Sequence, residues 1–152
     1  ACMAGYTDEP LATNYSAIPV MEIHGLADQI VPYGSSFTTG VLLEETLEGD
    51  EGAIQNMYWW ADANGCPGSV PDIETVEWDY TVKRFSGCTN GADVVLVTMN
   101  YAQHNSYLND YDGTDSPFYQ AILTGNPTGI DASQRAWDFL SQHSKSVESN
   151  EG

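Results

Sequence analysis

A carboxylate and an imidazole follow the two most apolar stretches of this chain. Asp28 lies just beyond the apolar run 18–25, and His104 lies just beyond the apolar run 92–99. Catalytic groups in open α/β sheets gather at the carboxyl ends of the strands. If the two runs are adjacent parallel strands, Asp28 can hold the His104 imidazole with Nδ1 protonated. Nε2 of His104 would then be free to act as a general base.

Strands and helices that could position these groups are visible in the hydrophobic pattern. Neither apolar run alternates with polar residues, which indicates strands buried on both faces, as in a parallel sheet. Apolar residues at helical spacing, together with capping signals, predict helices at 35–47, from about 54 to 64, and at 131–143. In the last helix Asp131 is the expected N-cap, and the apolar side consists of Ala132, Ala136, Trp137, Phe139 and Leu140. Residues 73–78 and 80–85 are rich in β-branched and aromatic side chains, so we expect short strands or a hairpin there.

The order of these elements, strand, helices, strand and helix, favours an α/β fold. We expect one domain segment over 1–152, built as a mostly parallel sheet with flanking helices. A long irregular region at 100–129 separates the second apolar run from the last helix. Loops of this length are usually functional or disordered. The polar tail 144–152 is expected to fray.

The charge of the chain excludes several classes of partner. Four Lys and Arg residues stand against 22 Asp and Glu residues, which gives a formal net charge of −18. Four cations are too few to bind along a phosphate backbone or an anionic membrane surface. We therefore expect neither nucleic acid nor membrane as a partner. The negative electrostatic field of the chain favours neutral or cationic substrates. Apolar residues make up 41% of the chain, enough for one hydrophobic core.

The cysteines and one sequon are typical of a secreted protein. Cys66 and Cys88 could bind a metal, but the gap between them holds no second ligand pair, so a disulfide is the better interpretation. Cys2 is left over, which suggests a free thiol or a partner outside this chain. Asn14 begins an Asn-Tyr-Ser glycosylation sequon. Clustered oxygens at 109–115 could hold Ca²⁺, although a solvated turn fits their spacing better.

Four segments resemble one family of secreted esterases. Residues 24–33, His-Gly-Leu-Ala-Asp-Gln-Ile-Val-Pro-Tyr, resemble the acid loop of α/β-hydrolases of the polyhydroxybutyrate-depolymerase-like family, which includes feruloyl and acetylxylan esterases. Residues 60–66, Trp-Ala-Asp-Ala-Asn-Gly-Cys, resemble a helix end of that family. Cys88 precedes a strand that leads toward a histidine loop, and 131–140 resemble the closing helix. The likeness spans about residues 17–143 and corresponds to the C-terminal part of such an α/β-hydrolase.

This resemblance implies a serine ester hydrolase that needs no cofactor and no metal. Asp28 would be the triad acid and His104 the base, in the chain order expected for this fold. Trp60, Tyr101 and Tyr107 are candidates for substrate binding, because aromatic rings stack on sugars and phenols. The substrates implied are acyl or phenolic esters on polysaccharides, or polyesters.

The nucleophile of such an enzyme is missing from the chain. No Gly-x-Ser-x-Gly motif occurs in the 152 residues, so the serine is expected on an upstream segment or a second chain. The alternative is a non-catalytic structural or carbohydrate-binding subunit of an extracellular assembly. Two other histidines are expected to be structural: His24 as a packed strand residue, and His143 in the last turn of a helix.

Overall fold

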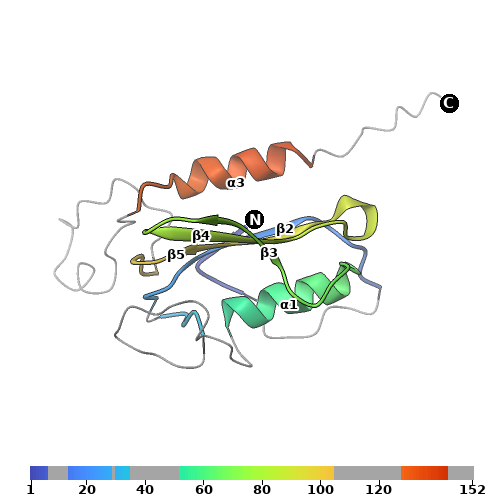
Figure 1. Ribbon diagram of the computed structural model, residues 1–152, viewed down its shortest axis with the longest axis horizontal. Helices are drawn as coiled ribbons and strands as arrows, with labels where there is room; N and C mark the ends of the chain where they lie inside the picture. The colour runs from blue at the N-terminus through green and yellow to red at the C-terminus, as the bar shows by residue number, and fades with distance from the viewer. Residues whose placement is uncertain (7–13, 29, 35–51, 105–127, 144–152) are drawn as a thin grey trace.

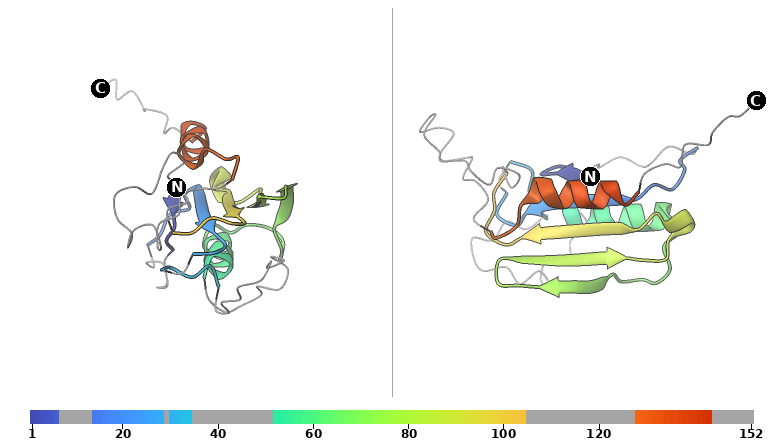
Figure 2. Two further views of the ribbon diagram at one scale, coloured as in Figure 1. Left: turned by 90° about the vertical axis from the view of Figure 1, so that its left-hand side faces the viewer. Right: turned by 90° about the horizontal axis from the view of Figure 1, so that it is seen from above.

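The computed structural model describes residues 1–6, 14–28, 30–34, 52–104 and 128–143. They form a sheet with one helix on each face (Figure 1, and end-on in Figure 2). The elements are β1 (Cys2–Met3), β2 (Val20–Gly25), α1 (Ala53–Ala63), β3 (Asp72–Val76), β4 (Tyr80–Phe85), the 3₁₀ turn η2 (Thr89–Gly91), β5 (Val94–Met99) and α3 (Ala132–Ser141). Within these ranges, no helix has the length and apolar character that a membrane crossing requires. The helix expected at 35–47 lies outside the described residues.

The sheet is mixed, so the prediction of a mostly parallel α/β-hydrolase sheet with flanking helices is wrong. The strand order is β1-β2-β5-β4-β3. The pairs β1–β2 and β2–β5 are parallel, whereas β5–β4 and β4–β3 are antiparallel. A parallel neighbour needs a crossover of about a dozen residues or more. The connection from Phe85 to Val94 is too short for that, so β4 runs against β5 and its hairpin partner β3 forms the outer edge (Figure 2).

The two apolar runs form the adjacent parallel strands on which the predicted site depends. β2 and β5 pair in register from Val20 opposite Val94 to Gly25 opposite Met99. All six residues of β5 are buried, as are the last five of β2. The chain passes from β2 to β5 through α1 on one face and then through the β3–β4 hairpin, a connection long enough to let both strands point the same way. Their carboxyl ends therefore lie at one edge of the sheet.

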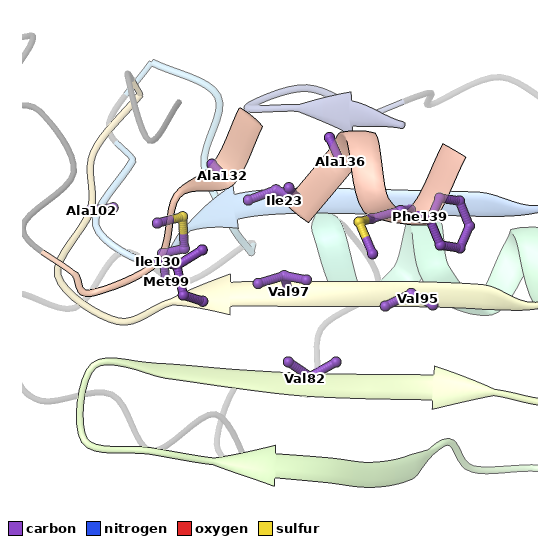
Figure 3. Packing of buried hydrophobic residues seen from close by; sticks show 11 residues of the cluster. Ile23, Val82, Val95, Val97, Met99, Ala102, Ile130, Ala132, Ala136 and Phe139 are labelled. Atoms are coloured by element: carbon purple, nitrogen blue, oxygen red, sulfur yellow. The ribbon is translucent and has the colours of Figure 1, made fainter. Parts of the chain in front are cut away.

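Helix α3 closes the core on one face of the sheet (Figure 3). The side chain of Asp131 accepts a hydrogen bond from the backbone N–H of Gln134 at 2.8 Å, which confirms the predicted N-cap. The buried side chains of this core are Met21, Ile23, Val82, Val95, Val97, Met99, Ala102, Ile130, Ala132, Ala136 and Phe139. Trp137 and Leu140, which the helical pattern also placed on the apolar side, are exposed instead.

Helix α1 packs on the opposite face, and a disulfide ties its end to the sheet. Cys66, just after the helix, is bonded to Cys88, which follows β4. This bond confirms the predicted pairing. Asn64, the last residue before the turn, is fully buried. Its Nδ2 donates to the carbonyls of Ile18 at 2.9 Å and Ala92 at 2.7 Å. These bonds anchor the end of α1 at the amino edge of the sheet.

Candidate active site

The loops that follow β2 and β5 lie against each other at the carboxyl edge of the sheet. The N–H of Leu26 donates to the carbonyl of Met99 at 2.9 Å, and that of Ala27 donates to the carbonyl of Ala102 at 3.1 Å. A Cβ on Gly25 would come within 2.3 Å of the Ala102 carbonyl oxygen. Only glycine permits this approach of the two backbones. The residues that follow each strand are therefore held in a fixed relation.

Asp28 and His104 meet across this contact. Nδ1 of His104 lies 2.9 Å from Oδ2 of Asp28, whose side chain is fully buried. An ionised carboxylate only accepts, so Nδ1 is the donor and Nε2 carries the lone pair. The His104 side chain is 27% exposed. Among the residues that the structure describes, Nε2 has no hydrogen-bond partner. Asp28 and His104 thus have the arrangement of a buried carboxylate behind a partly exposed imidazole.

The second oxygen of Asp28 is held by the backbone of its own loop. Oδ1 accepts hydrogen bonds from the N–H groups of Ile30 at 2.8 Å and Val31 at 2.9 Å. The ordinary role of a turn aspartate is therefore present beside the contact with His104. Because both oxygens are engaged, the carboxylate is fixed with Oδ2 toward the imidazole.

A second histidine stands behind Asp28. His24 is fully buried in β2, as expected for a packed strand residue. Its Nε2 lies 2.9 Å from the Val31 carbonyl and 3.5 Å from Oδ2 of Asp28. Its Nδ1 lies 3.0 Å from Oε1 of Glu22. Sequence reasoning did not anticipate this polar contact, because Glu22 stands inside an apolar run.

The pKa of His24 reflects these neighbours. Burial alone would lower it, since desolvation disfavours the charged ring. The hydrogen bond with Glu22 and the charge of that carboxylate act in the opposite direction, as do the Val31 carbonyl and the charge of Asp28. The net effect is a pKa raised above the ordinary value of histidine. The imidazolium form is therefore favoured in this buried position.

The carboxylate of Glu22 is also fixed from α1. Its Oε2 accepts a hydrogen bond from Nδ2 of Asn56 at 2.6 Å, and both side chains are buried. Helical spacing marked α1 as a packing helix but gave no sign that Asn56 faces a carboxylate. A buried amide and a buried acid in otherwise apolar elements are the signal that could have pointed to such a network.

The three aromatic candidates for substrate binding differ in where they lie relative to Asp28 and His104. Tyr101 lies just beyond β5, on the edge that carries His104, and its ring centroid is 6.0 Å from that of Trp78. Both rings are exposed. Trp60 packs on Tyr15 one turn before the end of α1, at the amino edge, and is not brought together with Asp28 and His104. Tyr107 lies outside the described residues.

The remaining predicted features are peripheral to this edge. Asn14 is exposed, as a glycosylated side chain must be. Cys2 is a free thiol that donates to the carbonyl of Gly5 at 2.8 Å.

The oxygen-rich segment 109–115 lies outside the described residues. His143 is in contact with the Phe139 ring at the end of α3. Within the described part of the chain, no group of three or more His, Cys, Asp or Glu side chains could hold a metal ion.

Comparison with known proteins adds no assignment to this site. No family model matches the chain, and no curated protein matches it either.

Proposed function

We propose that Asp28 and His104 are the acid and the base of a secreted serine ester hydrolase whose nucleophilic serine is supplied by another polypeptide segment. The observation that carries this proposal is the 2.9 Å contact between Oδ2 of the buried Asp28 and Nδ1 of the partly exposed His104. A histidine held at Nδ1 in this way keeps Nε2 available as a general base, which supports the proposal. The resemblance of residues 24–33 to an esterase acid loop supports the choice of reaction.

In this mechanism His104 moves one proton in each direction. Its Nε2 takes the proton of the serine hydroxyl while the serine oxygen bonds to the ester carbonyl carbon. The same proton passes to the alcohol oxygen as the ester C–O bond breaks. A water molecule then adds to the acyl-serine, and Nε2 takes its proton and returns it to the serine oxygen. Asp28 stays ionised and stabilises the imidazolium that forms in both steps.

The charge of the chain limits the proposed class of substrate, and the disulfide bears on the proposed location. A net charge of −18 disfavours anionic substrates, so neutral acyl or phenolic esters on polysaccharides, or polyesters, are the proposed substrate class. The Cys66–Cys88 disulfide is compatible with an extracellular protein. No cofactor is needed for ester hydrolysis by this route.

A second candidate is a non-catalytic structural or carbohydrate-binding subunit. The absence of Gly-x-Ser-x-Gly from the 152 residues favours it. The two candidates differ in one measurable property, which is the presence of an activated serine next to Nε2 of His104. An inert subunit would keep the Asp28–His104 bond for structure alone.

A fluorophosphonate probe on the native protein, with everything that copurifies, separates the two candidates. We expect a covalent adduct on one serine, together with hydrolysis of acetyl or feruloyl esters. His104→Gln in the same assembly should abolish both, whereas His143→Gln, a matched change at the end of α3, should abolish neither. Native material without a labelled serine and without ester hydrolysis would contradict the hydrolase and leave the non-catalytic subunit.

A further inference from the structure

The described part of the chain contains a buried polar network that the proposed mechanism leaves unused. It runs from Asn56 through Glu22 and His24 to Oδ2 of Asp28. The four side chains are all buried. Buried polar groups of this kind are costly unless each one is hydrogen-bonded. Because these side chains lie directly behind Asp28, they can influence its contact with His104.

The protons of this network can be assigned from its acceptors. A backbone carbonyl only accepts, so Nε2 of His24 must donate to Val31. Nδ1 faces a carboxylate oxygen of Glu22 at 3.0 Å, and one proton must lie between the two atoms. Imidazole is more basic than a carboxylate, which assigns that proton to the ring, and the contacts with Glu22, Val31 and Asp28 raise the pKa of His24 in the same sense. His24 is then an imidazolium paired with a glutamate, and its other N–H also faces Asp28.

We propose that His24, held as a cation by Glu22, is a positioning residue that fixes Oδ2 of Asp28 against Nδ1 of His104 and so keeps Nε2 of His104 as the free base nitrogen. Oδ2 of Asp28 lies 2.9 Å from Nδ1 of His104 and 3.5 Å from Nε2 of His24, so the two rings face one carboxylate oxygen. The attraction between the His24 cation and this oxygen holds the carboxylate in the orientation in which it accepts from Nδ1 of His104.

Other groups that face His24 do not carry a compensating charge near neutral pH. The ring of Tyr33, in the acid loop, and the ring of Tyr6, after β1, each have their centroid 5.8 Å from that of His24. Cys2 lies opposite Glu22 in the β1–β2 pairing, and burial, followed by the charge of Glu22, raises the pKa of its thiol. Phenols and a thiol of this kind are neutral at pH 7. Among the described residues, the charged groups of this cluster are thus Glu22, His24 and Asp28, with His104 on the far side of the carboxylate.

The change Glu22→Gln tests the proposal with little change of shape. The amide oxygen can accept from Asn56, and the amide N–H can donate to Nδ1 of His24. Nε2 keeps its bond to Val31, so every contact survives while the ring loses its second proton. Glu74→Gln is the matched control, because it removes the same charge from an exposed residue paired with Arg84 on the hairpin.

Ring-nitrogen NMR of the full chain reads the outcome without any need for catalysis. The chain has three histidines, and His143→Gln assigns one of them. In the wild type we expect both nitrogens of His24 to be protonated at pH 6, and in Glu22→Gln only Nε2. The Nδ1 proton of His104, which is bonded to Asp28, should exchange slowly with solvent in the wild type and in Glu74→Gln. It should exchange faster in Glu22→Gln, because Asp28 is then held less firmly.

A neutral His24 ring in the wild type at pH 6 would overturn the proposal, and this measurement needs no variant to fold. Unchanged exchange of the His104 Nδ1 proton in a folded Glu22→Gln protein would overturn it as well. The role in catalysis rests on the proposed function, where Glu22→Gln should lower kcat while KM stays within about twofold, because His24 acts on the base and not on the substrate. Loss of the hydrolase proposal would leave the NMR result standing, so the two failures are distinguishable.

Discussion

Oδ2 of Asp28 lies 2.9 Å from Nδ1 of His104, although 76 positions separate the two residues in the chain. The bond joins the loops beyond β2 and β5, whose last residues, Gly25 and Met99, are register partners. The parallel pairing of two buried strands therefore delivers both side chains to one edge of the sheet. A carboxylate and an imidazole held by the sheet itself are preorganised, as the proposed proton transfer requires.

The change Asp28→Asn should reduce ester hydrolysis about 10³- to 10⁴-fold and leave the fold intact. The remaining amide oxygen can still accept from the N–H groups of Ile30 and Val31. The amide nitrogen, however, would donate to Nδ1 of His104, move the proton to Nε2 and remove the base. Turnover of the assembled protein and urea denaturation of the chain measure the two effects. Asp62→Asn, on the exposed side of α1, is the control, and unchanged turnover in Asp28→Asn would contradict the assignment.

The change Gly25→Ala should separate the two loops. Its Cβ would lie 2.3 Å from the Ala102 carbonyl oxygen and 2.6 Å from that of Gln103, and these atoms are backbone. The segment that leads to His104 must move, at a cost of about 2 kcal/mol or more in the free energy of unfolding. Denaturation measures this cost, and the ring nitrogens of His104 report loss of the bond to Asp28. Gly5→Ala, where a Cβ meets no atom closer than 3.9 Å, should behave as the wild type.

The stability of the chain should depend on pH through His24. A histidine whose pKa is raised on folding stabilises the fold fully below its unfolded pKa of about 6.5, and this contribution is lost as pH rises through the folded pKa. Glu22→Gln removes the main cause of the raised pKa. The difference in unfolding free energy between wild type and Glu22→Gln should be largest below about pH 6.5 and shrink at higher pH. Urea titrations across this window, with Glu74→Gln as control, test it; a difference that grows with pH would contradict the assignment.

Removal of the disulfide should destabilise the chain without disturbing the candidate site. Cys66 and Cys88 lie 22 positions apart, and a crosslink over such a loop contributes about 3 kcal/mol by restricting the unfolded chain. The double change to serine should lower the free energy of unfolding by about this amount. The His104 ring-nitrogen spectrum should stay unchanged, because the bond lies with the end of α1 at the amino edge of the sheet. A changed His104 spectrum would show that the two edges are coupled.

The elements with strong patterns could be predicted from the sequence, and those set by pairing could not. β2, β5, α1 and α3 follow from apolar periodicity and caps. The contact of Asp28 with His104 was predicted only on the condition that the two apolar runs pair as adjacent parallel strands, which they do. β1 has only two residues and exists because β2 offers a free edge. The direction of β4 depends on the short connection to β5 rather than on its composition. A pattern of residue types describes one strand, whereas register and direction belong to a pair.

The network behind the acid escaped prediction for a related reason. Glu22 contacts Asn56, which lies 34 positions away, and the residues around each one do not indicate this contact. The partner of an acid inside an apolar strand can be identified only once the helix that covers the strand has been placed. His24 was predicted to be packed, which is confirmed, but its two charged neighbours give it a second property. Burial can be predicted from an apolar run, whereas the protonation of a buried ring depends on which groups surround it.

Tyr101 should contribute to the binding of aromatic esters. Its side chain is 49% exposed and tilted at 37° to the ring of Trp78, which is 71% exposed. The side chain of Asn100 donates to the Trp78 carbonyl at 3.0 Å and holds the two segments together at the edge that carries His104. Two exposed rings in fixed relation offer a surface on which a phenolic or sugar ring can stack.

The change Tyr101→Ala should therefore raise KM for a feruloyl ester about fivefold, which corresponds to about 1 kcal/mol of stacking. The kcat should stay within about twofold, because the ring does not touch the reacting atoms. An acetyl ester, which has no ring to stack, should show no change in KM. Trp137→Ala removes another exposed ring, from α3, and is the control. An equal rise of KM for both esters would show that Tyr101 shapes the loop rather than binding the ring.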